Sequence, residues 1–406
     1  MRFSSRTVPN DPNPIALAEA QARSTGHALR KLNDSNPTKH GLGPELIAQV
    51  YDADPKGPQD SRIMLSKMLN RRNYQCCDSS NCTESQGNVD PEDIYLLSST
   101  SQAYSWLIKL LCDAEDVVLM PKPGYPLIES IARLECVNAI SYPLRYDGSW
   151  TIDIAAIREM MIKDVGGRIK ALVLINPNNP TASYVREEER KAVVELCKQH
   201  GVAIIADEVF FDYALTDREQ ASPRRRFAGE RQVLTFALDG FSKMLAAPHA
   251  KVGWIQLSGP ESDVREAQIR LDAIADDYLP MSALITCHMS QMLALIDSQL
   301  ALVRQRIVDN YALLRQLLAE DRFGLVDVLR AEGGWNVLLR VPAVIDEDDL
   351  VLALIKHHKL TAQPGYFFDM ASNGFLALSL LPEHAEFASN VRDVLSEVHS
   401  QLSIES

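Results

Sequence analysis

Residues 171–181 read Ala-Leu-Val-Leu-Ile-Asn-Pro-Asn-Asn-Pro-Thr. The five apolar residues predict a buried strand, and the two Asn-Pro pairs after them predict a turn. Two similar stretches follow, because the apolar run 202–205 precedes Asp207 and the run 233–237 precedes Lys243. Uninterrupted apolar runs are typical of strands in a parallel sheet, which is covered on both faces. The three stretches therefore predict three strands that each lead into polar residues.

Around these strands the chain alternates between strand and helix patterns as far as about residue 285. Before residue 171 we predict strands at 93–98 and 116–120 and helices at 101–112 and 127–134. Alternation on this scale implies a mostly parallel sheet with helices on both faces. We expect residues 35–285 to form one large α/β domain.

The rest of the chain predicts a second, smaller unit. A helical pattern runs from Ser282 to Glu320 and should join the two units. Shorter patterns predict a strand at 335–339, a helix at 348–358 and a strand at 374–379. We expect residues 286–406 to form a small α+β domain. Residues 1–34, which hold a helical pattern before a turn-rich break at 33–37, should be an N-terminal arm that joins it.

Composition limits the partners. The chain has 406 residues, a formal charge of -13 and a pI near 5.2, which argues against nucleic acid or an anionic membrane as the main partner. The sequence is 46% hydrophobic, but no apolar stretch is as long as a membrane-spanning helix requires, and the first residues do not form the apolar core of a signal peptide. With seven scattered cysteines, this predicts a cytoplasmic protein with reduced thiols that binds small molecules. The cysteines at 76, 77 and 82 lack a second pair at zinc-like spacing, so we expect no metal site.

The polar residues after the strands suit one cofactor. Open α/β sheets bind ligands where their strands end. Lys243 offers an amine for an imine, Asp207 offers an acid for a ring nitrogen, and Lys251 offers a cation for a phosphate. These are the needs of pyridoxal phosphate. Taken singly, each residue has a plainer reading: a surface lysine, a helix-capping acid, or a turn.

The ordered set resembles the class I/II aminotransferases, which are fold-type I enzymes that use pyridoxal phosphate. That family carries Asn-Pro-Thr-Gly, Asp-Glu-Val-Tyr and Ser-Lys motifs and a basic residue eight positions after the lysine. Here the matching residues are Asn179 to Thr181, Asp207 to Val209, Ser242-Lys243 and Lys251. The likeness extends from about Asn33 to Leu402. It implies a large domain with a mostly parallel sheet, a small α+β domain, and a homodimer.

The resemblance also implies roles for single residues. Lys243 would form the Schiff base and then act as general base and acid. Asp207 would pair with the pyridine nitrogen, Asn179 would bond the ring hydroxyl oxygen, and Tyr125 would stack on the ring. The phosphate would lie at a helix N-terminus; its candidate ligands are Ser99, Thr100, Ser101, Gln102, Ser242 and Lys251. Tyr51, in a loose match that includes Gly57, would reach the phosphate of the partner subunit.

Five departures from the family pattern bear on function. Phe210 replaces the motif tyrosine beside the ring oxygen, which should raise the pKa of the internal imine, and Lys251 replaces the usual arginine. Gly240 stands where many relatives have a hydroxyl residue, and Ala182 replaces a glycine, which suggests a slightly altered loop. The fifth is the strand 375–379, Phe-Leu-Ala-Leu-Ser, which lacks the arginine that grips a substrate carboxylate. Either another group holds the carboxylate, such as an arginine from elsewhere or backbone amides around Asn36, or the substrate lacks that carboxylate.

The leading prediction is therefore an aminotransferase that moves an amino group from an amino acid or amine to a keto acid or aldehyde. One alternative keeps the cofactor but changes the reaction, to a C–S lyase, decarboxylase or cyclase type. Another is a ligand sensor without turnover. Substrate choice should depend on loop and small-domain side chains such as Trp335, Asn336, Tyr366 and Phe367.

Overall fold

The computed structural model describes residue 4 and residues 24–25, 53–75, 89–215 and 224–404. Tyr51, most of the predicted N-terminal arm and the cysteines at 76–82 lie outside these ranges. Within them, no helix is both long and apolar enough to cross a membrane.

The larger of two sheets has eight strands in the order β1-β8-β7-β6-β5-β2-β3-β4. Six of these strands run in one direction, because only β8 and β4 pair antiparallel with their neighbours. The predicted mostly parallel sheet is confirmed. The bounds are β1 (Ile94–Leu97), β2 (Val117–Lys122), β3 (Asn138–Tyr146), β4 (Trp150–Ile152), β5 (Ile169–Ile175), β6 (Ala203–Asp207), β7 (Thr235–Gly240) and β8 (Gly253–Ser258).

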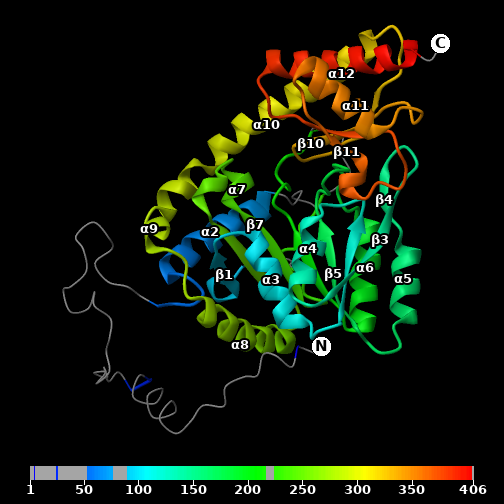
Figure 1. Cartoon of the computed structure of the whole chain (residues 1–406). Coiled ribbons are helices and arrows are strands. Elements are labelled where there is room, and N and C mark those ends of the chain that lie inside the picture. Colours follow the sequence, from blue (N-terminus) through cyan, green and yellow to red (C-terminus); the bar gives the residue numbers. More distant parts are fainter. Residues whose placement is uncertain (1–3, 5–23, 26–52, 76–88, 216–223, 405–406) are drawn as a thin grey trace.

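Helices cover both faces of this sheet (Figure 1). One face is covered by α3 (Thr100–Leu111), α4 (Leu127–Leu134) and α8 (Glu261–Tyr278), and the other by α5 (Ile154–Lys163) and α6 (Glu187–His200). Residues 171–175 of β5 show why this part of the sequence is continuously apolar. Val173 packs on the first group of helices and Leu174 on the second, so the strand is buried on both faces.

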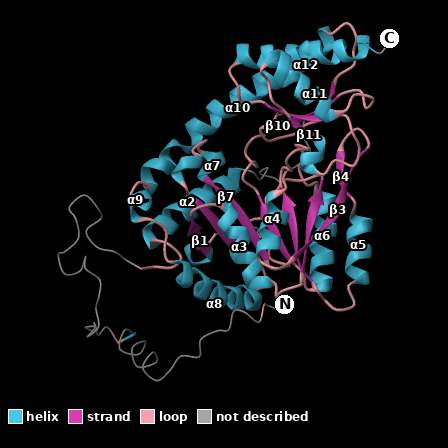
Figure 2. Ribbon diagram, in the orientation of Figure 1, coloured by secondary structure: helices cyan, strands magenta, loops and turns pink. Residues whose placement is uncertain are grey.

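The smaller sheet has the order β11-β12-β10-β9. Its strands are β9 (Asp327–Val328), β10 (Asn336–Arg340), β11 (Gln363–Pro364) and β12 (Phe375–Ser379). The helices α10 (Met289–Glu320), α11 (Glu347–Ala353), which continues as the π-helix η5 (Leu354–His358), and α12 (His384–Ile404) lie beside it (Figure 2). Figure 1 shows α10 running from the large sheet to the small one. The division into domains at residue 285 stays a prediction.

The remaining helices are short or lie near the start of the described chain. They are α2 (Gln59–Gln75), α7 (Phe241–Met244), α9 (Ala283–Thr286), and the 3-10 helices η2 (Pro91–Asp93), η4 (Pro248–Ala250) and η6 (Gly365–Phe368).

The prediction of one continuous helix from Ser282 to Glu320 was wrong. The pattern from Ser282 to Glu320 is not a single helix, because α9 ends before Cys287 and α10 begins at Met289. The Sγ atom of Cys287 and the Nδ1 atom of His288 both contact the carbonyl of Leu284. Side chains that bond to nearby backbone in this way compete with the helical ladder, and the apolar pattern does not show that competition.

Candidate active site

The ends of three parallel neighbours bring the predicted residues together. In the sheet register, Ile175 of β5 lies beside Asp207 of β6, and Asp207 lies beside Leu238 of β7. The backbone N–H of Asn176 donates to the carbonyl of Asp207 at 2.8 Å. The loop after β5, the acid that ends β6 and the helix after β7 therefore share one edge of the sheet, as expected of a ligand site in an open α/β sheet.

Lys243 lies on α7, which begins directly after β7. Its Nζ atom is 5.2 Å from the ring centroid of Phe210 and 5.0 Å from that of Trp335. The hydroxyl of Tyr213 donates to the Lys243 carbonyl and holds this turn. Burial lowers the pKa of Lys243, while the charge of Asp207 acts in the opposite direction. A lysine with a lowered pKa is more often deprotonated, which is the form that attacks an aldehyde.

Asp207 is held by two donors. The hydroxyl of Tyr104 donates to Oδ2 at 3.0 Å, and the backbone N–H of Val209 donates to Oδ1 at 3.2 Å. Desolvation nevertheless raises the pKa of Asp207 to about 6, against the opposing effects of these bonds and of Lys243. A nearby cation would stabilise the ionised carboxyl group. Tyr104 was missed by the sequence prediction, although its place one turn after Thr100 on a predicted helix puts it on the same face.

The predicted phosphate ligands meet at the start of α3. Ser99 caps this helix, since its hydroxyl accepts from the N–H of Gln102 at 3.2 Å. The Gln102 side chain in turn accepts from the hydroxyl of Ser98 at 2.7 Å. Thr100 and Ser101 occupy the first turn of α3, whose backbone N–H groups suit an anion.

The strand register also places the segment before β8, which carries Lys251, near the start of α3. Gly253 pairs with Leu97 on one side and with Gly240 on the other. A Cβ atom at Gly253 would lie 3.1 Å from the carbonyl carbon of Ser99, so glycine allows the two loops to approach. Lys251 lies two residues earlier, is exposed, and has a left-handed backbone with φ of 52°.

The same register explains one departure from the family pattern. A Cβ atom at Gly240 would lie 2.8 Å from the carbonyl oxygen of Val252. A hydroxyl residue at this position would force the backbone of β7 and β8 apart. Ser242, two residues later on α7, is half-buried and is the nearest hydroxyl in the sequence.

The turn after β5 carries Asn179 towards the small sheet. The side-chain amide of Asn336 donates to Oδ1 of Asn179 at 3.2 Å. Ala182 has φ of 56°, so it adopts the left-handed conformation that glycine favours. Its carbonyl accepts from the backbone N–H groups of Glu332 and Gly333 at 2.8 and 3.0 Å, and these bonds hold the alanine in that conformation.

The other predicted residues lie at the edges of this group or outside the described chain. Tyr125 follows β2 and is 47% exposed, so its stacking role stays a prediction. Phe210 is buried and packs edge-on against Trp335 with centroids 5.4 Å apart. Tyr51 lies outside the described residues. Trp335 and Asn336 are brought to the site, whereas the hydroxyl of Tyr366 is turned to Asp348 at 2.7 Å.

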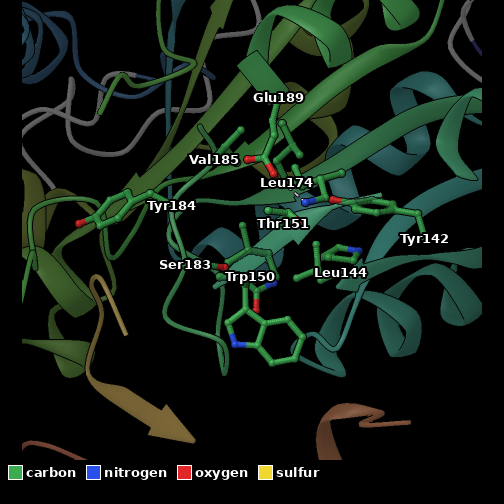
Figure 3. Close-up of a pocket in the computed structure, with 13 residues that line it drawn as sticks. Tyr142, Leu144, Trp150, Thr151, Leu174, Ser183, Tyr184, Val185 and Glu189 are labelled. Atoms are coloured by element: carbon green, nitrogen blue, oxygen red, sulfur yellow. Dashed lines mark hydrogen bonds between the residues drawn. The ribbon is translucent and has the colours of Figure 1, made fainter. Parts of the chain in front are cut away.

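The pocket in Figure 3 is a different feature. It encloses about 20 Å³ beside the β3–β4 hairpin and the loop after β5, and none of the predicted site residues lines it. Its size suits a single water molecule. Trp150, Tyr184 and Glu189 are among its lining residues. The candidate site is therefore defined by the strand ends and not by this pocket.

Comparisons with known proteins agree with this arrangement. Residues 73–386 match the family described as aminotransferase class I and II. The alanine aminotransferase of Mycobacterium tuberculosis is 27% identical over 391 residues, which cover 93% of this chain and 87% of that protein. The glutamate-pyruvate aminotransferase of Escherichia coli is 27% identical over 257 residues, which cover 62% of this chain and 60% of that protein.

Solved structures show the same fold. The alanine aminotransferase from Pyrococcus furiosus gives a TM-score of 0.74 at 17% identity, over 98% of this chain and 100% of that one. The tyrosine aminotransferase from Leishmania infantum gives 0.72 at 20% identity, over 86% and 83%. The family match and the aminotransferase names of the two sequence relatives favour amino-group transfer over the lyase and sensor alternatives. The family match extends over most of the sequence, and the chain therefore belongs to the class I and II aminotransferases, which depend on pyridoxal phosphate.

Proposed function

We propose that Lys243 is the residue that carries pyridoxal phosphate in this aminotransferase. The observation that carries the proposal is the place of its amine, which lies within 5.2 Å of two aromatic rings and has a lowered pKa. This environment favours a neutral amine, and a neutral amine is needed both to bond an aldehyde and to remove a proton.

Asp207 supports the proposal independently. Its carboxyl group accepts from Tyr104 and Val209, and its pKa is raised to about 6. A cation beside such a carboxyl group strongly stabilises its ionised form, and the protonated pyridine nitrogen of the cofactor would be such a cation. The cofactor, held in this way, supplies an electron sink for the bond broken next to the amine.

The remaining ligands are proposed on the same basis. Asn179 would donate to the ring hydroxyl oxygen, and Tyr125 would stack on the ring. The phosphate would be held by the groups at the start of α3 and after β7, namely Ser99, Thr100, Ser101, Gln102, Ser242 and Lys251. Phe210 would line the ring without a hydrogen bond to it.

The freed Lys243 would then move a proton between the substrate carbon and the cofactor. Its position on a four-residue helix anchored by Phe241 and by the Tyr213 hydroxyl limits where the amine can reach. Proton transfer of this kind needs the base within hydrogen-bond reach of the carbon-bound proton. The aromatic walls of Phe210 and Trp335 would keep water away from that proton.

The spectrum of the purified protein tests the proposal. Wild type with pyridoxal phosphate should show a yellow imine band that amino donors bleach, and Lys243→Ala should bind the cofactor without forming that internal imine. Lys251→Ala is the matched control: it should keep the imine band and bind the cofactor about tenfold more weakly. An imine band that persists in Lys243→Ala without added amine, and that hydride reduction traps on another lysine, would refute the assignment.

We further propose that the protein works in the cytoplasm as a homodimer whose sites are completed by Tyr51 of the second copy. The described cysteines at 136, 197 and 287 are free thiols, which suits a reducing compartment. Large apolar side chains are exposed along the chain from α8 to α10, at Tyr278, Leu279, Leu284, Leu295 and Leu302. Light scattering on the holoenzyme, with Tyr51→Phe assayed for cofactor affinity, tests both parts.

A further inference from the structure

One helix contacts both ends of the proposed cofactor site. The first turn of α3 carries groups that we propose to hold the phosphate, and Tyr104 follows one turn after Thr100 on the same helix. Four residues of a helix span about 6 Å, and at that distance from Thr100 the hydroxyl of Tyr104 contacts the carboxylate of Asp207. The helix that begins at the proposed phosphate site therefore also holds the acid proposed for the ring nitrogen.

The hydrogen bonds on Asp207 have a definite direction. A phenol can donate or accept, whereas an ionised carboxylate only accepts, so Tyr104 is the donor in the 3.0 Å bond to Oδ2. The backbone N–H of Val209 donates to Oδ1. Burial and the negative charge of Asp207 raise the pKa of Tyr104 well above its usual value, so the phenol keeps its proton. Both carboxylate oxygens are thereby held as acceptors.

Within the described ranges, Tyr104 is the only side chain that donates to this carboxyl group. No lysine or arginine of those ranges forms an ion pair with Asp207, and Lys243 acts on it through its charge at longer range. A hydrogen bond to a charged acceptor changes the proton affinity of that acceptor by about tenfold or more. The hydroxyl of Tyr104 therefore has a large influence on how strongly Asp207 binds a proton.

We propose, on the basis of the proposed function, that Tyr104 is a positioning residue that keeps the proton shared by Asp207 and the cofactor on the pyridine nitrogen. A protonated ring nitrogen makes the cofactor an effective electron sink. The proton of such a pair lies with the more basic partner, and the bond from Tyr104 makes Asp207 less basic. In this role Tyr104 acts through Asp207 and needs no contact with the substrate.

A matched control separates this role from the general need of a buried phenol for a hydrogen-bond partner. Tyr95 of β1 is fully buried, and its hydroxyl donates to Oδ1 of Asp272 at 2.6 Å. The two pairs have the same chemistry, but Asp272 lies on α8 and is not among the proposed cofactor ligands. Tyr95→Phe therefore removes a phenol–carboxylate bond without changing the proposed site.

The experiment uses holoenzyme loaded with pyridoxal phosphate that carries ¹⁵N in its ring. The chemical shift of this nitrogen reports its protonation, and the measurement needs no amino donor. At about pH 7.5, wild type and Tyr95→Phe should both show a protonated nitrogen. Tyr104→Phe should move the resonance towards the neutral value, because the proton affinity of Asp207 rises by about tenfold.

The cofactor-free protein gives a second readout. Loss of the donor raises the pKa of Asp207 further above its value in the unfolded chain, so the folded protein continues to lose stability to a higher pH. Urea unfolding should therefore show that Tyr104→Phe is destabilised relative to wild type by more at about pH 8 than at about pH 5. An equal difference at both pH values would contradict the coupling between Tyr104 and Asp207.

A double-mutant cycle tests whether Tyr104 acts through Asp207. In the Asp207→Asn background, Tyr104→Phe should change the nitrogen shift no further, because the acid on which it acts is gone. An unchanged shift in the single variant Tyr104→Phe, or an equal change in both backgrounds, would overturn the proposal. Either result would leave the imine band of wild type in place, whereas failure of the proposed function would appear as an internal imine on another lysine in Lys243→Ala.

Discussion

Replacing Asp207 by asparagine should stabilise the cofactor-free protein at neutral pH. The reason is that the folded protein raises the pKa of this carboxyl group from 3.8 to about 6. An acid whose pKa is raised by folding binds its proton more tightly in the folded protein than in the unfolded chain. The stability of the folded protein is therefore unaffected by this group below about pH 4 and decreases as the pH rises through 6. Asparagine has no charge to desolvate and avoids that loss.

The size of the effect follows from the shift. About two pKa units correspond to about 3 kcal/mol of unfolding free energy at pH 7.5. Asparagine would weaken the bonds that Asp207 accepts from Tyr104 and Val209, which offsets about 1 kcal/mol. The cofactor-free variant should therefore be more stable than wild type by about 2 kcal/mol at pH 7.5. At pH 4 the ionisation of Asp207 contributes only about 0.5 kcal/mol, so the weakened hydrogen bonds should make the variant less stable by roughly 0.5 kcal/mol.

Urea unfolding of both cofactor-free proteins between pH 4 and pH 8 measures this difference directly. Asp93→Asn is the matched control, because burial also raises the pKa of Asp93 to about 6 but Asp93 lies at the end of η2, directly before β1 and outside the candidate site. Both variants should gain stability without the cofactor, and only Asp207→Asn should lose cofactor affinity, by at least tenfold. An Asp207→Asn protein that is less stable at pH 7.5, or that binds the cofactor as wild type does, would refute the reasoning.

Two further substitutions test departures from the family pattern. Phe210→Tyr adds a hydroxyl beside the proposed ring oxygen and should lower the pKa of the imine band by about one unit; spectrophotometric titration measures it, and an unchanged pKa would exclude contact with the ring. Ala182→Gly relieves a left-handed alanine with φ of 56° and should raise the unfolding free energy by about 1 kcal/mol; urea unfolding measures it, and a loss of stability would show that the bonds to Glu332 and Gly333 leave no strain.

Local patterns were sufficient for most of the secondary structure. The helix predicted at 127–134 is confirmed as α4, and the strands predicted from the runs at 171–175 and 202–205 are confirmed as β5 and β6. The two strands are buried on both faces and the helix buries one side, so each has a simple apolar pattern in the sequence. The antiparallel insertion of β8 between β1 and β7 was not predicted, because pairing direction leaves no mark on the sequence of a strand that is buried on both faces.

The sequence by itself determined the sheet-forming runs, the order of Asn179, Asp207 and Lys243, and so the class of enzyme, since all of these depend on neighbouring residues or on motif order. Only the tertiary structure decided which distant side chains complete the site. Tyr104 bonds Asp207 across 103 positions and Asn336 bonds Asn179 across 157. Such contacts depend on strand order and register, which residues acquire only when the whole sheet closes its hydrogen bonds and buries both faces.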